Sequence, residues 1–408
     1  MSLLIYIIAG EPSGDVLGGR LMAALKDLTG GAVRFAGIGG RAMRAEGLES
    51  LFPMGDLSVM GLAEVVPRIP HILNRLGETV ADIGRKRPDA VVTIDSLGFT
   101  GRVQRRVKRR FPGIPRIHYV APMVWAWKPD RARTLADSVD LLLTLLPFEP
   151  DWFVREGLAT VHVGHPVAES GLDRGDGAAF RARLGIAAEA PLLLVLPGSR
   201  HSETSRLLPV FKQTMAELAG RIPNLVVVVP TVETVAAEVA AAVKSWPVPT
   251  FVVEDAAVKA DVFAAATAAL AASGTVSVEL AMAGVPMVVG YKVSPLSAFV
   301  ATRFLGLRLK YASLINIVAD APVIPELLQG RCRPDRLAEA VERLLTDADA
   351  RRGQVDAART ALASLIGEGE APSLRAARAV LSALERDDIG LTRERVNPMS
   401  ESHSNLLK

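Results

Sequence analysis

The sequence contains very little cysteine, no long hydrophobic stretch and little excess charge. Cys332 is its single cysteine, which excludes an intramolecular disulfide framework and cysteine-rich zinc or iron–sulfur sites and fits a reducing compartment. No apolar run reaches the roughly 18 residues that a membrane-spanning helix needs. The formal net charge of +3 is too small for a general nucleic-acid binder, so a basic partner site would have to be local.

Length and composition indicate a folded chain of several domains. The 408 residues are at least twice the usual domain size, and 50% of them are hydrophobic, so two or three packed units are expected. The apolar run Leu3–Ala9 lacks a basic flank and ends at Gly10, and we interpret it as a buried strand rather than a signal peptide.

The first half of the chain alternates strands with helices. A helical stripe over Val16–Leu28, with Asp15 as its predicted N-cap, follows the first strand. Further strands are predicted at Val33–Gly37, Ala90–Asp95, Arg116–Val120 and Leu141–Leu145. This alternation is typical of a doubly wound α/β domain.

The same rhythm restarts after Pro166 and the polar stretch Glu169–Gly177. Strands are predicted at Leu192–Leu196, Leu225–Val229, Thr250–Val253, Leu270–Ala272 and Met287–Gly290. The predicted domains are a Rossmann-like domain over 1–168, a second one over 178–345, C-terminal helices over 346–385 and a flexible tail over 386–408. The last of the C-terminal helices is predicted from an apolar stripe that follows Ser373, its expected N-cap. One option for these helices is that they pack back on the first domain. The active site is expected in a central cleft between the two sheets.

Three loops carry candidate chemistry. Gly10–Asp15 lies between a strand and a helix, where a negatively charged ligand is favoured, although a tight turn capped by Asp15 needs the same residues. Its spacing is not G-x-G-x-x-G, so a nicotinamide cofactor is weakly supported. Asp95 ends a strand and suits a general base, unless it only caps the following loop. Arg200 can pair with phosphate oxygens bidentately, or with Glu203 at the surface.

Eight ordered segments carry a family resemblance. They are AGEPSGD at Ala9–Asp15, GIGG at Gly37–Gly40, LSVMGLAEV at Leu57–Val65, HYVAPMVWAWKPDRA at His118–Ala132, VGHPV at Val163–Val167, LPGSRHSE at Leu196–Glu203, ASGTVSVELAMAGVPMVVGYKVS at Ala272–Ser294, and INIVAD with VIPELLQ at Ile315–Gln329. In order and spacing the chain resembles the lipid-A-disaccharide synthase family of bacterial lipopolysaccharide biosynthesis, from about Ile7 to Arg343.

The resemblance implies a GT-B fold and an inverting glycosyltransferase. Its substrates would be UDP-2,3-diacylglucosamine and 2,3-diacylglucosamine 1-phosphate, and its products a β-1,6-linked lipid A disaccharide 1-phosphate and UDP. The first domain would face acceptor and membrane, the second would bind the UDP-sugar, and no metal or other cofactor is expected. Asp95 aligns with the essential aspartate. The substrate-binding residues that it implies are Glu11, Ser13, Gly14, Ser199, Arg200, Ser273, Gly274, Thr275, Glu279 and Asn316.

Two of these assignments have plainer alternatives. Glu279, expected to accept hydrogen bonds from the ribose hydroxyls, would otherwise be a solvated helical residue. Asn316 would otherwise be a turn former in a loop. Ser273, Gly274 and Thr275 precede a predicted helix over Val276–Ala283, whose N-terminus would stabilise negative charge on the leaving UDP.

The chain also departs from the family pattern. Members commonly have Pro-Asp-Phe-Asn one residue after the aspartate, whereas this chain continues with Ser96-Leu97-Gly98-Phe99-Thr100 and lacks the second carboxylate. Acceptor choice is therefore open. The alternatives are another UDP-sugar GT-B enzyme, either a 2-epimerase or a transferase to a soluble acceptor, and a decayed sugar-nucleotide-binding scaffold. Retention of Asp95, Arg200 and Glu279 speaks against decay.

An apolar stripe over Val65–Leu76 is the candidate membrane-binding surface. Ile69, Ile72 and Leu73 are the expected membrane contacts, helped by the basic run between Arg102 and Arg110. A core-facing helix and a solvated basic face are the alternatives. The expectation is a cytoplasmic protein held peripherally on the inner membrane of a Gram-negative bacterium, with homodimer formation left open. Trp125 and Trp127 are interpreted as core or interface aromatics. No metal site is expected at His162 and His165, which would point to opposite faces of an extended segment.

Overall fold

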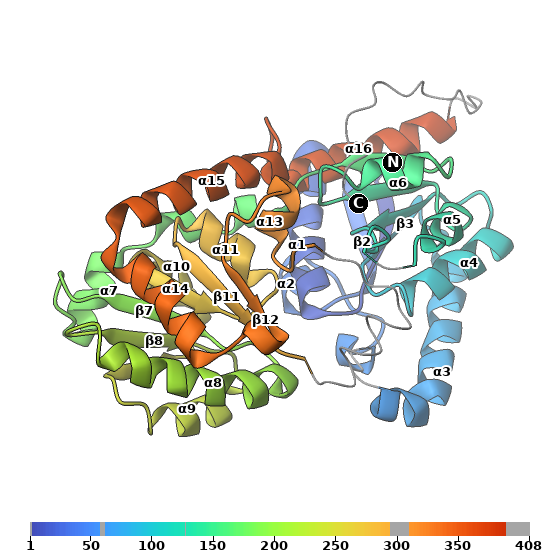
Figure 1. The fold of residues 1–408 in the computed structure, drawn as a ribbon. Helices are drawn as coiled ribbons and strands as arrows, with labels where there is room; N and C mark the ends of the chain where they lie inside the picture. The colour runs from blue at the N-terminus through green and yellow to red at the C-terminus, as the bar shows by residue number, and fades with distance from the viewer. Residues whose placement is uncertain (1, 58–61, 127, 294–309, 389–408) are drawn as a thin grey trace. The chain divides into compact units, whose positions relative to one another are not determined.

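The chain folds into two compact units. The structure, a computed structural model, describes residues 2–57, 62–126, 128–293 and 310–388. Unit 1 comprises Met1–Pro166 and Gly367–Lys408, and unit 2 comprises Val167–Ile366. The chain therefore passes from unit 1 into unit 2 and returns to unit 1 with its last described helix (Figure 1).

Unit 1 is built on a parallel sheet of six strands. Every position of its two central strands, Ala90–Ile94 and Arg116–Tyr119, is buried, as expected where helices cover both faces. The spatial order is β2-β1-β3-β4-β5-β6. The strands are β1 (Leu3–Ala9), β2 (Val33–Ile38), β3 (Ala90–Ile94), β4 (Arg116–Tyr119), β5 (Leu141–Thr144) and β6 (Ala159–His162). No strand was predicted for the edge segment β6, in which exposed and half-buried positions alternate.

Helices cover both faces of this sheet. Helices α1 and α16 pack on one face through Leu21, Leu25 and Val380, while α3, α4, α5 and α6 contribute to the cores on the other face. The helices of unit 1 are α1 (Pro12–Leu28), α2 (Arg41–Ala45), α3 (Leu62–Lys86), α4 (Thr100–Arg110), α5 (Arg131–Ala136), α6 (Pro150–Val154) and α16 (Pro372–Asp388).

Two predicted helix caps are wrong. Helix α1 begins at Pro12, a residue well suited to a first helical turn, so Asp15 lies inside the helix. The Asp15 carboxylate instead accepts hydrogen bonds from the backbone N–H groups of Gly40, Ala42 and Met43, at 2.6, 2.8 and 3.1 Å. It therefore caps the short helix α2. Likewise α16 begins at Pro372, which places Ser373 within the helix.

Unit 2 repeats the architecture with a second parallel sheet. Its order is β12-β11-β10-β7-β8-β9. The strands are β7 (Leu192–Leu196), β8 (Val226–Pro230), β9 (Thr250–Val253), β10 (Ala268–Ala271), β11 (Met287–Tyr291) and β12 (Glu326–Leu328). Its helices are α7 (Gly177–Leu184), α8 (His201–Ala219), α9 (Ala236–Val243), α10 (Lys259–Ala264), α11 (Val276–Met282), α13 (Leu314–Ala319), α14 (Pro334–Thr346) and α15 (Ala348–Ile366). Helices α15 and α16, which the sequence analysis grouped together, thus belong to different units.

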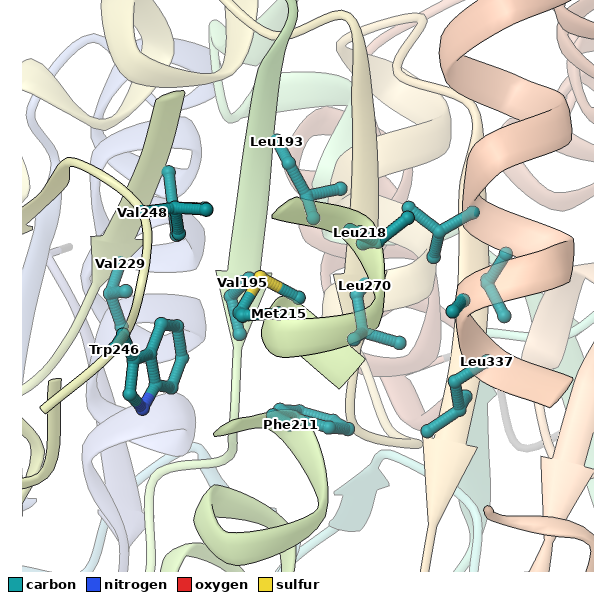
Figure 2. Packing of buried hydrophobic residues seen from close by; sticks show 14 of the residues in the cluster. Leu193, Val195, Phe211, Met215, Leu218, Val229, Trp246, Val248, Leu270 and Leu337 are labelled. Atoms are coloured by element: carbon teal, nitrogen blue, oxygen red, sulfur yellow. The ribbon is translucent and has the colours of Figure 1, made fainter. Parts of the chain in front are cut away.

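The larger core of unit 2 lies between its sheet and helices α8, α9 and α14. Figure 2 shows Met215 of α8 close to Val195 of a central strand, and Phe211, Leu193 and Leu270 belong to the same buried cluster. Phe211 is fully buried, and a Phe→Ala change at such a position typically costs about 3–5 kcal/mol. This packing fixes the strand ends from which the loops of unit 2 leave.

Each sheet has one topological switch point. In unit 1 the chain runs from β1 outward to β2 and then returns to β3 on the other side of β1. In unit 2 it runs from β7 through β8 and β9 and then returns to β10 beside β7. Successive connections leave in opposite directions at these two points, and open α/β sheets bind ligands there, outside the carboxyl ends of the strands.

Candidate active site

The two candidate loops of unit 1 lie next to each other at its switch point. Ala9 of β1 pairs with Ile94 of β3, so Gly10–Gly14 and Asp95–Phe99 leave from neighbouring strand ends. A Cβ on Gly10 would lie only 3.0 Å from Ser96 Oγ. Gly14 is buried where α1 packs against Ile94. The two loops are therefore in close contact, and glycine permits that approach.

Asp95 is held firmly at the end of β3. Its φ of 51° is in the left-handed region, which aspartate tolerates better than most residues. Its backbone N–H donates to the Tyr119 carbonyl at 2.9 Å, and the Thr100 hydroxyl donates to the Asp95 carbonyl at 2.6 Å. The backbone N–H of Ser96 donates to Asp95 Oδ1 at 2.7 Å. The carboxylate is half-buried, so it is oriented and still accessible.

Ser96 links the two loops. Its hydroxyl donates to Glu11 Oε1 at 3.3 Å, while its backbone N–H binds Asp95. Glu11 is the N-cap residue of α1 but makes no side-chain cap, which leaves its carboxylate free for this contact. Ser13 is exposed in the first turn of α1. From the sequence, Ser96 was only part of a departure from the family pattern, and its connection to Glu11 was not predicted.

The altered segment after Asp95 is well ordered by packing. Phe99 is buried in the core against α3, and Thr100 is fully buried with its hydroxyl on the Asp95 carbonyl. Gly98 is exposed, and a Cβ on it would meet no atom within 4 Å. Thr100 therefore supports the backbone, and Gly98 leaves open space where the family commonly has a carboxylate.

The candidate loops of unit 2 meet at the second switch point. Leu196 of β7 pairs with Ala271 of β10, so Pro197–Arg200 and Ala272–Thr275 leave side by side. Gly198 has φ 110°, and a Cβ on it would lie 2.4 Å from Glu203 Oε2. The backbone N–H of Ser199 donates to that same oxygen at 3.0 Å. Glu203 thus packs under the first loop and shapes it.

Arg200 lies at the N-cap of α8 with its side chain 56% exposed. Its Nη1 is 3.7 Å from Glu203 Oε1, which is too long for a hydrogen bond. The pairing with Glu203 that the sequence left open is present, but at this distance, with the guanidinium in solvent, it contributes only about 0–1 kcal/mol. The guanidinium remains available to a ligand.

Glu203 is a residue that the sequence analysis did not assign to the site. It is 9% exposed and accepts hydrogen bonds from the Ser199 N–H and, at 3.4 Å, from the Tyr291 hydroxyl. Burial, and then the charge of Glu203, raise the pKa of Tyr291. Glu203 follows Arg200 by three residues at the start of α8. This i, i+3 spacing, which brings two helical side chains together, was the sequence signal for a role of Glu203 in the site.

The second loop of unit 2 leads into α11. The Ser273 hydroxyl donates to the Ala312 carbonyl at 3.1 Å, and Gly274 has φ 144°, a conformation that favours glycine. Thr275 is the N-cap residue of α11, and both Gly274 and Thr275 are exposed. The predicted helix over Val276–Ala283 is observed as Val276–Met282.

Glu279 is not the freely solvated residue that was the plainer alternative. Lys259 Nζ lies 2.8 Å from both of its carboxylate oxygens. The two side chains are 34% and 30% exposed. Lys259, which begins α10, was not predicted from the sequence as a site residue.

Asn316 lies in helix α13, not in a loop, and its side chain is engaged internally. Its Nδ2 donates to the Ile324 carbonyl and to Glu326 Oε1, both at 2.8 Å, while its Oδ1 accepts from the Ile324 N–H at 2.8 Å. It is 1% exposed. Glu326 also accepts from the N–H groups of Ala312 and Ser313. Asn316 therefore supports the segment beside Ser273 rather than presenting its amide to solvent.

The predicted membrane face is only partly exposed. Ile69 and Leu73 are 42% and 43% exposed, whereas Leu76 is buried and Ile72 packs against the same core. The inclusion of Leu76 in an exposed face is therefore wrong, and the side chains of Val65 and Val66 lie outside the described residues. Within the described part of the chain, no helix is long and apolar enough to cross a membrane.

The basic side chains of α3 and α4 differ in whether their charge is already paired within the protein. Arg75 is paired with Asp56 at 2.7 Å and with Glu78 at 2.7 Å, which offsets its charge. On α4, which packs against α3, the side chains of Arg102, Arg105 and Arg109 are exposed. The basic run is the stronger positive surface.

Trp125 is half-buried and packs edge-to-face on Phe148, with ring centres 5.4 Å apart. Its indole N–H donates to Glu149 Oε1 at 3.4 Å, and the backbone N–H groups of Leu145 and Leu146 donate to Oε2. Burial raises the pKa of Glu149 to about 7. Trp127 lies outside the described residues.

The two histidines near the end of unit 1 have separate environments. His162 Nε2 lies 3.2 Å from the Leu145 carbonyl, and burial lowers the pKa of His165 to about 4. Among the residues that the structure describes, no group of three or more His, Cys, Asp or Glu side chains is suited to hold a metal ion.

Two Rossmann-like units with their candidate loops at the switch points define the GT-B class of proteins, and solved structures of that fold agree. MurG of Acinetobacter baumannii matches with a TM-score of 0.55 at 16% identity, over 94% of this chain and 99% of its own. The calicheamicin glycosyltransferase CalG4 matches with a TM-score of 0.57 at 18% identity over the same shares. S. aureus MnaA in a co-structure with UDP gives a TM-score of 0.64 at 12% identity, over 98% of this chain and 100% of its own.

Sequence comparison narrows the class to one family. The family model for lipid-A-disaccharide synthetase matches residues 5–377. The lipid-A-disaccharide synthase of Paramagnetospirillum magneticum is 64% identical over 384 residues, covering 94% of this chain and 98% of the relative. That of Rhodospirillum centenum is 55% identical over 385 residues, covering 94% and 95%. The chain belongs to the lipid-A-disaccharide synthetase family.

Proposed function

We propose that the chain is an inverting glycosyltransferase that joins UDP-2,3-diacylglucosamine to 2,3-diacylglucosamine 1-phosphate, forming the β-1,6-linked lipid A disaccharide 1-phosphate and UDP. Family membership over nearly the whole chain supports a glycosyltransferase of lipid A synthesis. The structural observation that carries the residue assignments is the coincidence of the family motifs with the two switch points.

Asp95 is the proposed general base. The acceptor hydroxyl becomes nucleophilic as its proton passes to the Asp95 carboxylate, its oxygen bonds to the anomeric carbon, and the bond from that carbon to the UDP oxygen breaks. Because Oδ1 already accepts from the Ser96 N–H, Oδ2 is the oxygen assigned to the proton. A positioned base typically contributes about 10²–10⁴-fold.

The second carboxylate near Asp95 comes from Glu11. Ser96 connects Glu11 to the loop of Asp95, and Ser13 and Gly14 follow in the first turn of the 17-residue helix α1. We assign this loop to the acceptor, whose 1-phosphate would be favoured by the positive end of the helix. Glu11 then orients a sugar hydroxyl as a hydrogen-bond acceptor.

The leaving UDP is assigned to the loops of unit 2. Arg200 is exposed at the start of the 19-residue helix α8 and would pair with diphosphate oxygens, together with the hydroxyl of the exposed Ser199 and backbone N–H groups of Ser273, Gly274 and Thr275. Glu279 would accept hydrogen bonds from the ribose hydroxyls. Asn316 acts indirectly, by holding the segment at Ala312 that receives the Ser273 hydroxyl.

The lipid substrates lead to a peripheral membrane location. Ile69 and Leu73 are exposed on α3, and α4 next to it carries the exposed basic side chains. We propose that these two helices contact the inner-membrane surface from the cytoplasmic side, with Ile72 supporting the pair from its half-buried position.

Product analysis tests the proposal directly. The purified chain is given UDP-2,3-diacylglucosamine with 2,3-diacylglucosamine 1-phosphate, and the products are identified by mass spectrometry. A tetraacyl disaccharide 1-phosphate and an equal amount of UDP are expected. Epimerised UDP-sugar without transfer, or transfer only to a soluble acceptor, would establish one of the alternative GT-B activities.

A further inference from the structure

Lys259 engages the carboxylate of Glu279 from a separate helix. It is the first residue of α10, and its Nζ lies 2.8 Å from both Oε1 and Oε2 of Glu279 on α11. The same Nζ lies 5.5 Å from the centre of the Phe263 ring, one turn along α10. The ammonium group is thus placed between a carboxylate and an aromatic face.

This ion pair is exposed enough to meet a ligand. The two side chains keep 34% and 30% of their surface accessible, and pairs of this kind contribute little to stability. Without Lys259, the Glu279 side chain would sample several rotamers, and ordering it would reduce the affinity for any ligand that it binds. The pair therefore has a clearer use in binding than in folding.

We propose that Lys259 is a positioning residue for the nucleotide, which holds Glu279 in one orientation so that the carboxylate accepts from the vicinal hydroxyls of the ribose. The inference rests on the proposed role of Glu279 as the ribose acceptor. An ionised carboxylate has about four lone-pair positions. Lys259 uses one on each oxygen, which leaves one on each oxygen for the 2′- and 3′-hydroxyls.

The test compares two nucleotides that differ only at the ribose. Dissociation constants for UDP and 2′-deoxy-UDP are measured by isothermal titration calorimetry with the full chain and its variants. For the unaltered chain, UDP should bind about tenfold or more tightly than 2′-deoxy-UDP, since a hydrogen bond to a charged group is lost. Glu279→Ala should remove most of that preference.

Lys259→Met should lower the preference for UDP by about threefold or more, and Lys259→Arg, which can donate to both oxygens, should restore it. Lys259→Gln, which keeps a single amide donor group, should give an intermediate value and serves if the methionine variant does not fold. Arg221→Met is the matched control. It removes a cation paired with Glu217 and Glu342 at the far end of α8 and should leave the preference unchanged.

Each result has one meaning. If Glu279→Ala keeps the full preference for UDP, Glu279 does not bind the ribose, and the proposed role of Lys259 is overturned as well. If Glu279→Ala loses the preference while Lys259→Met keeps it, only the role of Lys259 is overturned. An equal loss of affinity for both nucleotides in Lys259→Met also overturns it. In the Glu279→Ala background, Lys259→Met should change the preference no further.

Discussion

Replacing Arg200 by alanine separates a structural from a ligand-binding role of its guanidinium. In the structure Arg200 has only a long contact with Glu203, 3.7 Å from Nη1 to Oε1, on a side chain that is 56% exposed. Such a pair contributes about 0–1 kcal/mol. We therefore expect Arg200→Ala to lower the free energy of unfolding by less than about 1 kcal/mol.

The expected effect on UDP is larger. Hydrogen bonds to charged groups contribute about 1.5–3 kcal/mol when both partners are desolvated, and a pair between guanidinium and diphosphate belongs to that class. At 1.4 kcal/mol per factor of ten, the dissociation constant for UDP should rise about 10- to 150-fold. Uridine carries no diphosphate, so its affinity should stay the same.

The assay is calorimetric titration with UDP and with uridine, together with urea unfolding of each variant. Lys212→Ala is the matched control, because Lys212 is an exposed cation further along α8. Unchanged UDP affinity in Arg200→Ala would refute the diphosphate assignment. Equal weakening of UDP and uridine would show instead that the Gly198–Arg200 loop had been deformed.

Four further predictions follow from the site and its surroundings. Asp95→Asn, which cannot take the acceptor proton, should lower turnover by about 10²-fold or more with UDP affinity retained, and near-normal turnover would remove Asp95 from the base role. Activity should persist in excess chelator because Arg200 and backbone N–H groups supply the positive potential, and a loss restored by a divalent cation would contradict this. Burial raises the pKa of Glu149 in the folded chain to about 7. The contribution of Glu149 to the free energy of unfolding should therefore fall by roughly 3 kcal/mol as the pH rises from about 4.5 to 7. In urea titrations, Glu149→Gln should show a flatter pH dependence of that free energy than the unaltered chain. Ile69→Asp with Leu73→Asp should release the chain from anionic vesicles in co-sedimentation and slow turnover on membrane-borne substrate. Val154→Asp, at a similarly exposed position on α6, should do neither. Unchanged sedimentation of the double variant would place the membrane contact elsewhere.

The buried strands were predictable because their apolar runs report burial directly. Leu3–Ala9 and Leu192–Leu196 are observed with the predicted bounds. Strands β6 and β12 were not, since they are short edge segments whose structure depends on pairing with β5 and β11. Local pattern carries no information about such a partner.

The amphipathic stripe on α3 shows a different limit. Ile69, Ile72, Leu73 and Leu76 share one broad face of a helix, and periodicity does not tell which part of that face turns inward. In the structure Leu76 and Ile72 pack on the core of unit 1, while Ile69 and Leu73 remain exposed. The membrane hypothesis therefore concerns one edge of the stripe.

The site partners that the sequence did not reveal share one physical feature. Ser96 binds Glu11 from 85 residues away, Tyr291 binds Glu203 from 88 away, and Lys259 binds Glu279 from 20 away. A carboxylate beside a ligand-binding strand end needs partners that fix its orientation, because an unpartnered one would lose affinity to ordering on binding. The parallel sheets bring such partners to the same edge from distant segments. Motifs along the chain therefore identify Glu11 and Glu279, whereas only the fold identifies Glu203 and the groups that orient these carboxylates.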